Sequence, residues 1–150
     1  IIAYSIFIIF LDQISKFLVL SKLGFERSIN IIPNLINFTL VKNKGAAFSL
    51  FSNSTNMLTI ISIIVSLILI TIILKSPPKS YWNFIGIAYL LGGTVGNGID
   101  RLFKGYVLDF LEFTPINFPI FNLADVSINI AMMCFIVDTI KNKDKSRIKY

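Results

Sequence analysis

The chain has 150 residues, 55% of them hydrophobic, with a mean hydropathy of +0.76 and a net charge of +6. A soluble domain of this length has too little interior to bury so much apolar surface, so the composition indicates an integral membrane protein. The basic residues are spread over segment ends and the C-terminal tail, so we expect no nucleic-acid partner. Having no histidine and one cysteine, the chain can form no Ser–His or Cys–His catalytic pair, no histidine metal site and no intrachain disulfide.

Four apolar stretches approach the roughly 20 residues that a helix needs to cross about 30 Å of hydrocarbon. They cover about residues 1–20, 57–74, 81–99 and 121–138. The first has no basic N-terminal region and no small-residue cleavage site, so we expect a retained helix and not a cleaved signal peptide. The predicted fold class is therefore a membrane α-helical protein, a single domain over residues 1–150 with four transmembrane helices.

The short connections predict the orientation of these helices. Basic residues in short loops mark the cytoplasmic side, and they occur in residues 75–79 and in the tail. We therefore expect a multi-pass protein with both termini in the cytoplasm. The longer connections, about residues 21–56 and 100–120, then face outward. The basic residues of the tail are Lys141, Lys143, Lys145, Arg147 and Lys149, and we expect them to contact anionic membrane lipid.

The first outer connection carries a strand-like pattern. Residues 35–41 are rich in strand-favouring side chains with partial alternation. The sequence Asn43-Lys44-Gly45 is typical of a turn, and Ala46-Ala47-Phe48-Ser49 follows it. We expect a small extracytoplasmic β-sheet here, between the first and second helices.

The third apolar stretch ends in polar residues. Gly92 and Gly96 have the four-residue spacing that lets neighbouring helix backbones approach closely. Beyond them lie Asn97, whose amide could hydrogen-bond a peptide backbone, and the adjacent Asp100 and Arg101. The Arg101 guanidinium could clamp a carboxylate, a substrate carbonyl or a phosphate.

Asp109 and Asp125 are the strongest candidates for chemistry. Ionisable groups at membrane depth are costly, so they are functional candidates by default. The two aspartates are sixteen positions apart, with two prolines between them, which lets both reach the same outer-leaflet level. Two carboxylates close together tend to share one proton, an acid and a base suited to activating water for attack on an amide. The alternative is structural: each aspartate caps a helix or pairs with a cation.

Other polar residues allow both structural and functional interpretations. Asp12 and Lys16 stand four apart on one helix face, so an ion pair that orients the first helix is as consistent with the spacing as a catalytic role. Asn43 and Asn122 could present amides to a substrate, or could satisfy the backbone at a turn or a helix end. Gly45 could permit close approach of the chain.

Five short motifs occur in one order along the chain, and together they closely resemble lipoprotein signal peptidase, the bacterial type II signal peptidase. They are Asp12-Gln13-x-x-Lys16, Asn43-x-Gly45-Ala46-Ala47-Phe48, Gly96-Asn97-x-x-Asp100-Arg101, Val107-x-Asp109-Phe110 and Phe121-Asn122-x-Ala124-Asp125. The resemblance implies an intramembrane aspartic endopeptidase of the bacterial inner membrane. Its substrate would be a diacylglyceryl-modified prolipoprotein, cut just before the lipidated cysteine.

The resemblance also assigns roles to residues. Asp109 and Asp125 would form the catalytic dyad near the outer leaflet. Supporting or substrate-binding positions would be Asn43, Gly45, Asn97, Asp100, Arg101, Asn122, Asp12 and Lys16. No metal and no cofactor is expected, and we expect a monomer. Two other classes stay open from the residues alone: a small transporter or channel that uses Asp12, Asp109 and Asp125 as an ion path, and a non-catalytic membrane scaffold.

Overall fold

The computed structural model describes residues 1–25, 27–45 and 54–147, with side chains to residue 143. The Ala46-Ala47-Phe48-Ser49 part of the second motif, and the side chains of the last three basic residues of the tail, lie outside the described residues. The described chain forms, in order, α1 (Ile2–Lys22), β1 (Ser28–Ile32), β2 (Ile36–Asn43), α2 (Thr55–Lys75), α3 (Tyr81–Lys104), β3 (Val107–Phe113) and α4 (Leu123–Arg147).

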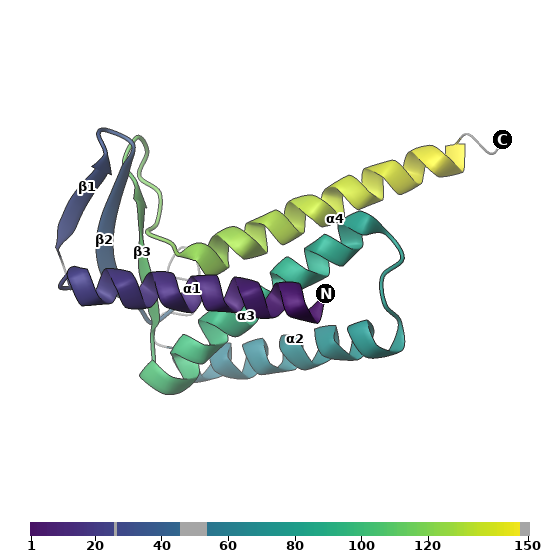
Figure 1. Ribbon diagram of the computed structural model, residues 1–150, viewed down its shortest axis with the longest axis horizontal. Coiled ribbons are helices and arrows are strands. Elements are labelled where there is room, and N and C mark those ends of the chain that lie inside the picture. Colours follow the sequence, from purple (N-terminus) through teal and green to yellow (C-terminus); the bar gives the residue numbers. More distant parts are fainter. Residues whose placement is uncertain (26, 46–53, 148–150) are drawn as a thin grey trace.

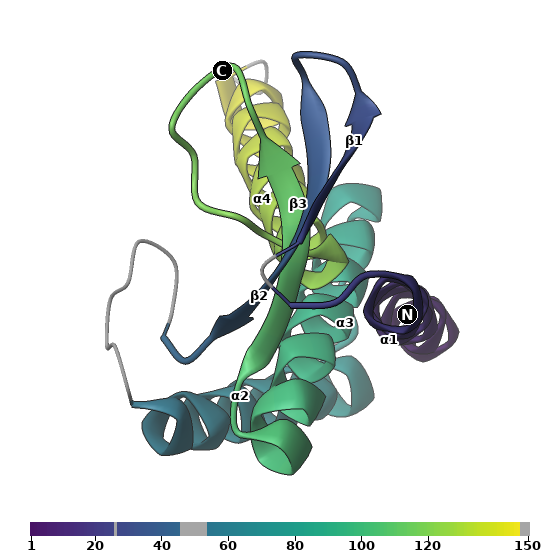
Figure 2. The same cartoon turned by 90° about the vertical axis from the view of Figure 1, so that its left-hand side faces the viewer.

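The sheet and the α2–α3 connection lie at opposite ends of the molecule. The sheet covers one end of the helical part, the end of α4 lies at the other, and α1 begins away from the sheet (Figure 1). Figure 2 views the molecule from the sheet side, where β3 crosses in front of α4 and part of α3.

The helices confirm the four apolar stretches and extend most of them. Helix α3 runs to Lys104, so Asp100 and Arg101 lie on a helix and not in the outer connection predicted for residues 100–120. Three of the described helices, α1, α2 and α4, are long and apolar enough to cross a membrane. Helix α3 is not among them, and its last turns carry Asn97, Asp100 and Arg101 of the third motif. Of the four transmembrane helices predicted, three are therefore long and apolar enough to span a membrane.

Large apolar side chains point outward from the helices. Ile60, Ile64 and Leu67 of α2 are each at least half exposed. A soluble protein would turn such a continuous apolar face inward, whereas a bilayer solvates it. The distribution of side chains therefore agrees with a membrane-embedded protein.

Helix α3 is the hub of the helical part, because it packs against α1, α2 and α4. Glycines mark its contacts. A Cβ added at Gly92 would lie 2.7 Å from Ile8 of α1, and one at Gly93 would lie 2.5 Å from the carbonyl oxygen of Ala124 in α4. At Gly96 the added atom would lie 2.7 Å from a carboxylate oxygen of Asp12. The predicted close approach at Gly92 and Gly96 is confirmed, and Gly93 adds a second contact on the α4 side.

The sheet has three strands, in the order β1-β2-β3, all antiparallel. Strand β2 is the strand expected at residues 35–41, and it forms a hairpin with β1, which was not predicted, through a tight turn in which Asn34 has a φ of 60°. The third strand was not predicted: residues 107–113 were assigned to an irregular outer connection. This strand exists because it pairs with β2, some 70 residues earlier in the chain, and no local pattern records such a partner.

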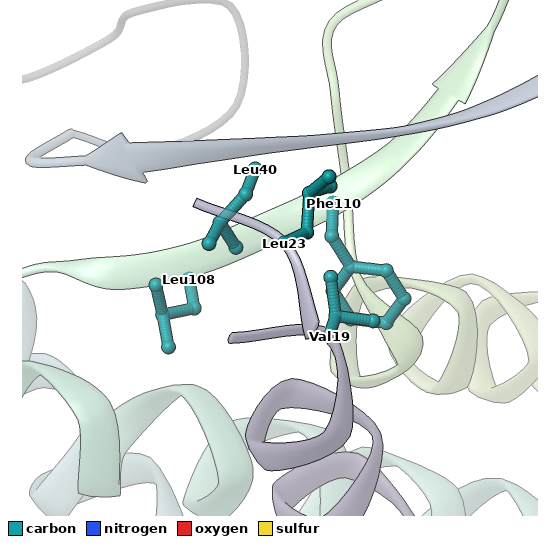
Figure 3. Close-up of a cluster of buried hydrophobic side chains, with 5 residues drawn as sticks. All are labelled: Val19, Leu23, Leu40, Leu108 and Phe110. Atoms are coloured by element: carbon teal, nitrogen blue, oxygen red, sulfur yellow. The ribbon is translucent and has the colours of Figure 1, made fainter. Parts of the chain in front are cut away.

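An apolar cluster docks the sheet onto the end of α1. Its buried members come from three elements, as Figure 3 shows. They are Val19 and Leu23 at the end of α1, Leu40 of β2, and Leu108 and Phe110 of β3. The cluster therefore fixes the position of β3 on both sides of Asp109.

The chain passes from α3 to β3 through one sharp turn. Gly105 ends the helix with a φ of 73°, and its N–H donates to the carbonyl of Arg101 at 3.1 Å. This left-handed conformation favours glycine and is a common way to end a helix. The turn lets β3 begin only three residues after α3 ends, so Asp109 lies close to the polar end of α3.

We predict that Gly93→Ala lowers the free energy of unfolding by about 2 kcal/mol, because the new methyl group would meet backbone atoms that cannot rotate away. Thermal melting in detergent measures this. The control is Gly98→Ala in the same helix. Its Cβ would meet the Ser62 side chain at 3.3 Å, and alanine would stabilise the helix by up to about 1 kcal/mol relative to glycine. Equal melting temperatures for the two variants would contradict the close packing at Gly93.

Candidate active site

The two aspartates predicted to be catalytic both bind one residue, Asn122. Asp109 is in the middle of β3 and Asp125 is in the first turn of α4. The side-chain Nδ2 of Asn122 donates to Asp109 Oδ1 at 2.6 Å, and the backbone N–H of Asn122 donates to Asp125 Oδ2 at 3.1 Å. One fully buried residue therefore binds both carboxylates.

Asn122 also caps α4. Its Oδ1 accepts the backbone N–H of Asp125 at 3.0 Å, while Asp125 accepts the N–H of Asn122 in return. This reciprocal pair is a capping box, which satisfies the free donors at a helix start. The structural alternative for Asp125 is thus correct as far as it goes, and the same bonds fix its carboxylate beside Asp109.

The segment before α4 follows β3. Phe121 accepts the backbone N–H groups of Phe110 and Leu111 and donates to the Leu111 carbonyl at 3.0 Å. This short antiparallel pairing places residue 122 next to residue 109, thirteen positions earlier in the sequence.

Two further asparagines bind the remaining carboxylate oxygens of Asp109 and Asp125. Asn43, at the end of β2, donates to Asp109 Oδ2 at 2.8 Å, and its Oδ1 accepts the N–H of Gly45 at 2.9 Å. It therefore shapes its own turn and contacts the site. Asn97 of α3 donates to Asp125 Oδ1 at 2.8 Å. Each oxygen of both aspartates thus accepts one N–H donor.

Behind Asn97 lies a buried group of charges. Lys16 is 0% exposed, and its Nζ lies 2.8 Å from Asp12 Oδ2, 2.9 Å from Asp100 Oδ2 and 3.0 Å from Asn97 Oδ1. Lys104 binds the other oxygen of Asp100 at 2.8 Å. The ion pair predicted from the spacing of Asp12 and Lys16 is confirmed, and it belongs to a larger cluster with two cations and two anions.

Burial controls the protonation of Asp109. Its side chain is 1% exposed. Burial, and after it the negative charge of Asp125, raises the pKa of Asp109 from 3.8 to about 7, against hydrogen bonds from Asn43 and Asn122 that favour the ionised form. At neutral pH this carboxyl is therefore divided between its acid and its ionised forms.

The aspartates line a cavity of about 900 Å³. Its polar wall also includes Arg101, whose Nη2 donates to the Gly45 carbonyl at 3.4 Å and whose charge acts on both aspartates. The remaining walls are largely apolar and come from α2, α4 and the segment before α4; they include Leu58, Ile61, Val65, Val126, Ile128, Phe118 and Phe121. The cavity can therefore hold a ligand with one polar and one apolar part.

Comparison with known proteins identifies the family. The family model described as signal peptidase (SPase) II matches residues 4–141. The chain belongs to the signal peptidase II family. The predicted resemblance is thereby confirmed, and the protein is a peptidase. The transporter and scaffold alternatives are set aside.

Relatives of this signal peptidase support the assignment over nearly its whole length. A protein named lipoprotein signal peptidase from Parasynechococcus marenigrum is 45% identical over 140 residues, which is 93% of this chain and 88% of that protein. Another from Trichormus variabilis is 42% identical over 137 residues, 91% of this chain and 87% of that protein. A solved bacterial membrane enzyme superposes with a TM-score of 0.89 at 30% identity, covering 96% of this chain and 89% of the other.

Every supporting residue predicted for the peptidase lies in or next to the site. Asn43, Asn97 and Asn122 bind the aspartates directly, and Arg101 lines the cavity. Gly45 hydrogen-bonds Asn43 and Arg101, and the other three residues form the charge cluster behind Asn97. They are Asp12, Lys16 and Asp100. Lys104 was missed, although it follows Asp100 at the spacing that separates Asp12 from Lys16. Within the described residues, no group of three or more acidic or cysteine side chains could hold a metal ion.

We predict that the peptidase loses stability as the pH rises from about 4 to 7, because the folded state binds the Asp109 proton more tightly than the unfolded chain does. The stabilisation is complete below the unfolded pKa and is lost through the folded pKa. One proton gives a slope of up to about 1.4 kcal/mol per pH unit. Asp109→Asn cannot ionise, so melting curves at pH 5 and pH 8 should differ less for this variant. An unchanged difference would contradict the raised pKa.

Proposed function

We propose that the protein is an intramembrane aspartic endopeptidase that removes the signal peptide from diacylglyceryl-modified prolipoproteins, cutting just before the lipidated cysteine. Asp109 and Asp125 are its catalytic dyad. The observation that carries this proposal is the meeting of the two carboxyl groups at Asn122, at the polar end of a cavity with apolar walls.

The shape of the cavity suits a lipidated peptide. The polar wall offers asparagine amides and Arg101 to a peptide backbone, while Leu58, Ile61 and Val65 belong to α2, one of the helices apolar enough to cross a membrane. Acyl chains of the substrate would stay in an apolar environment, where each buried methylene contributes about 0.8 kcal/mol. The relatives named lipoprotein signal peptidase support the same substrate class.

The two aspartates differ in their surroundings, and this difference suggests their roles. Asp109 is the more buried and takes the proton, so it acts as the acid that donates to the developing oxyanion. Asp125, which is less buried and accepts N–H donors from Asn97 and Asn122, is the base that takes a proton from water. The water attacks the scissile carbonyl, and the pair then protonates the leaving amine.

We further propose that the protein is multi-pass in the bacterial inner membrane, with α3 as the fourth spanning helix. The buried polar turns of α3 face α1 and the site, so they need no contact with lipid. The α2–α3 connection and the end of α4 lie away from the sheet (Figure 1), Lys75 and Lys79 flank that connection, and Lys141 and Lys143 lie near the end of α4. That end is cytoplasmic by the positive-inside rule. The sheet and the dyad then lie near the outer leaflet.

We predict that Asp109→Asn and Asp125→Asn each lower turnover of a diacylglyceryl-modified prolipoprotein by roughly a thousandfold or more, because water activation needs both groups. The double variant should be scarcely worse than either single one. Purified proteins in detergent, with the release of signal peptide as the readout, give the measurement.

The matched control is Asp138→Asn, which changes another buried aspartate of α4 at the opposite end of that helix. Asp138 binds Ser80, Asn83 and Asn142. This variant should keep turnover near that of the wild type. Substantial activity in either dyad variant would rule out the proposed mechanism.

We predict that a membrane-impermeant thiol reagent added from outside reaches a cysteine placed at Asn117 and misses one placed at Lys79. The background is Cys134→Ala, which removes the single native cysteine. Permeabilised cells, in which both positions should react, are the control. Labelling at position 79 in intact cells would reverse the proposed orientation.

A further inference from the structure

The buried ammonium of Lys16 does more than balance the charge of two carboxylates. Its three N–H donors meet three acceptors: Asp12, Asp100 and the Oδ1 of Asn97. A lysine has no further donor, so its hydrogen-bonding capacity is fully used. The arrangement fixes the ammonium relative to two helices, α1 and α3.

The two carboxylates bound by Lys16 each hold the residue that precedes a dyad aspartate. Asp12 Oδ1 accepts the backbone N–H of Ala124 at 3.0 Å, one residue before Asp125. Asp100 Oδ2 accepts the backbone N–H of Leu108 at 3.3 Å, one residue before Asp109. The ammonium therefore links the backbone of β3 to that of α4 through two carboxylates.

The third contact of Lys16 determines which way the Asn97 amide points. Asn97 Oδ1 accepts hydrogen bonds from Lys16 Nζ and from Asn122 Nδ2, each at 3.0 Å, and both of these nitrogens can only donate. A reversed amide would bring its own N–H groups against the ammonium. Asn97 must therefore turn its Nδ2 toward Asp125, to which it donates at 2.8 Å.

We propose that Lys16 is a positioning residue for the dyad: it sets the spacing of the backbone segments that carry Asp109 and Asp125, and it orients the Asn97 amide as a donor to Asp125. This inference rests on the proposed function of the two aspartates. Lys16 touches neither of them directly and acts through Asn97, Asp12 and Asp100.

Lys104 provides the matched comparison. It binds Asp100 at the same 2.8 Å that separates Lys16 from Asp12, and it also follows its aspartate by four residues. Its side chain is one-third exposed, and its described contact is with Asp100 and not with Asn97. Loss of Lys104 therefore removes a cation from the cluster and leaves the orientation of Asn97 in place.

The test uses the charge-balanced variant Lys16→Met/Asp12→Asn, because Lys16→Met alone would leave an excess of buried negative charge. We expect kcat to fall by about a hundredfold with KM within about twofold of the wild type, since a displaced catalytic group costs rate and leaves substrate binding intact. Lys104→Met removes a cation from the same cluster but leaves the orientation of Asn97 in place, so it should lower kcat much less than the Lys16 variant does. Melting temperatures show that each compared protein is folded.

A double-mutant cycle then tests the path through Asn97. Asn97→Ala should lower kcat, and adding Lys16→Met/Asp12→Asn to it should lower kcat by much less than in the wild-type background. Full additivity, a wild-type kcat in the folded Lys16 variant, or an equal loss in Lys104→Met would overturn the proposal. If the Lys16 variant does not fold, Asn97→Ala decides: a fall in kcat at constant KM supports the proposal, and wild-type kinetics overturn it.

The dyad variants separate this inference from the proposed function. Turnover that survives in Asp109→Asn or Asp125→Asn removes the dyad itself. Turnover that needs both aspartates but is indifferent to Lys16 and Asn97 leaves the dyad in place and removes only the positioning role.

Discussion

The site depends on how closely α3 approaches the helices on both of its sides. Where α1 and α4 pack against it, α3 has glycine, and an added methyl group would meet Ile8, Asp12 or the Ala124 carbonyl. This proximity brings polar groups of three helices within hydrogen-bonding distance of one another. With longer side chains at these positions, the buried donors and acceptors would lie too far apart to satisfy each other, and an unsatisfied buried group costs about 1–3 kcal/mol.

Charge balance is the second requirement of such a site. Lys16, Asp12, Asp100 and Lys104 form a neutral set, with the first three fully buried. Replacing such a set by apolar residues is often neutral for stability, so its presence is better explained by the geometry that it imposes than by the energy that it adds. The two catalytic candidates are not balanced in this way. They are two acids that share a partly polar cavity with Arg101, and burial makes the ionisation of Asp109 unfavourable.

Local patterns predicted the helices and the residues of the site, because apolar length and motif order are written along the chain. They did not predict strand β3, whose partner β2 is remote in the sequence and which contains an aspartate. The end of α3 lies later than predicted for a related reason: the buried carboxylate of Asp100 is bound by Lys16 of α1, and the sequence alone does not show that contact. Asp12 and Lys16, and likewise Asp100 and Lys104, are four residues apart, a spacing that indicates an ion pair on a helix. The ion pair was predicted only for Asp12 and Lys16.

The turn before α4 has a consequence for the order in which the protein matures. Asn122 and Asp125 lie at the start of α4, while Asp109, Asn97 and Asn43 precede them in the chain and are made earlier. During synthesis, Asp109 therefore waits without its partner until α4 enters the membrane and its first turn is capped. A nascent chain that lacks this helix has neither the bridging amide nor the second carboxylate. The proposed hydrolytic activity would thus be withheld from an incomplete protein by the order of its own sequence.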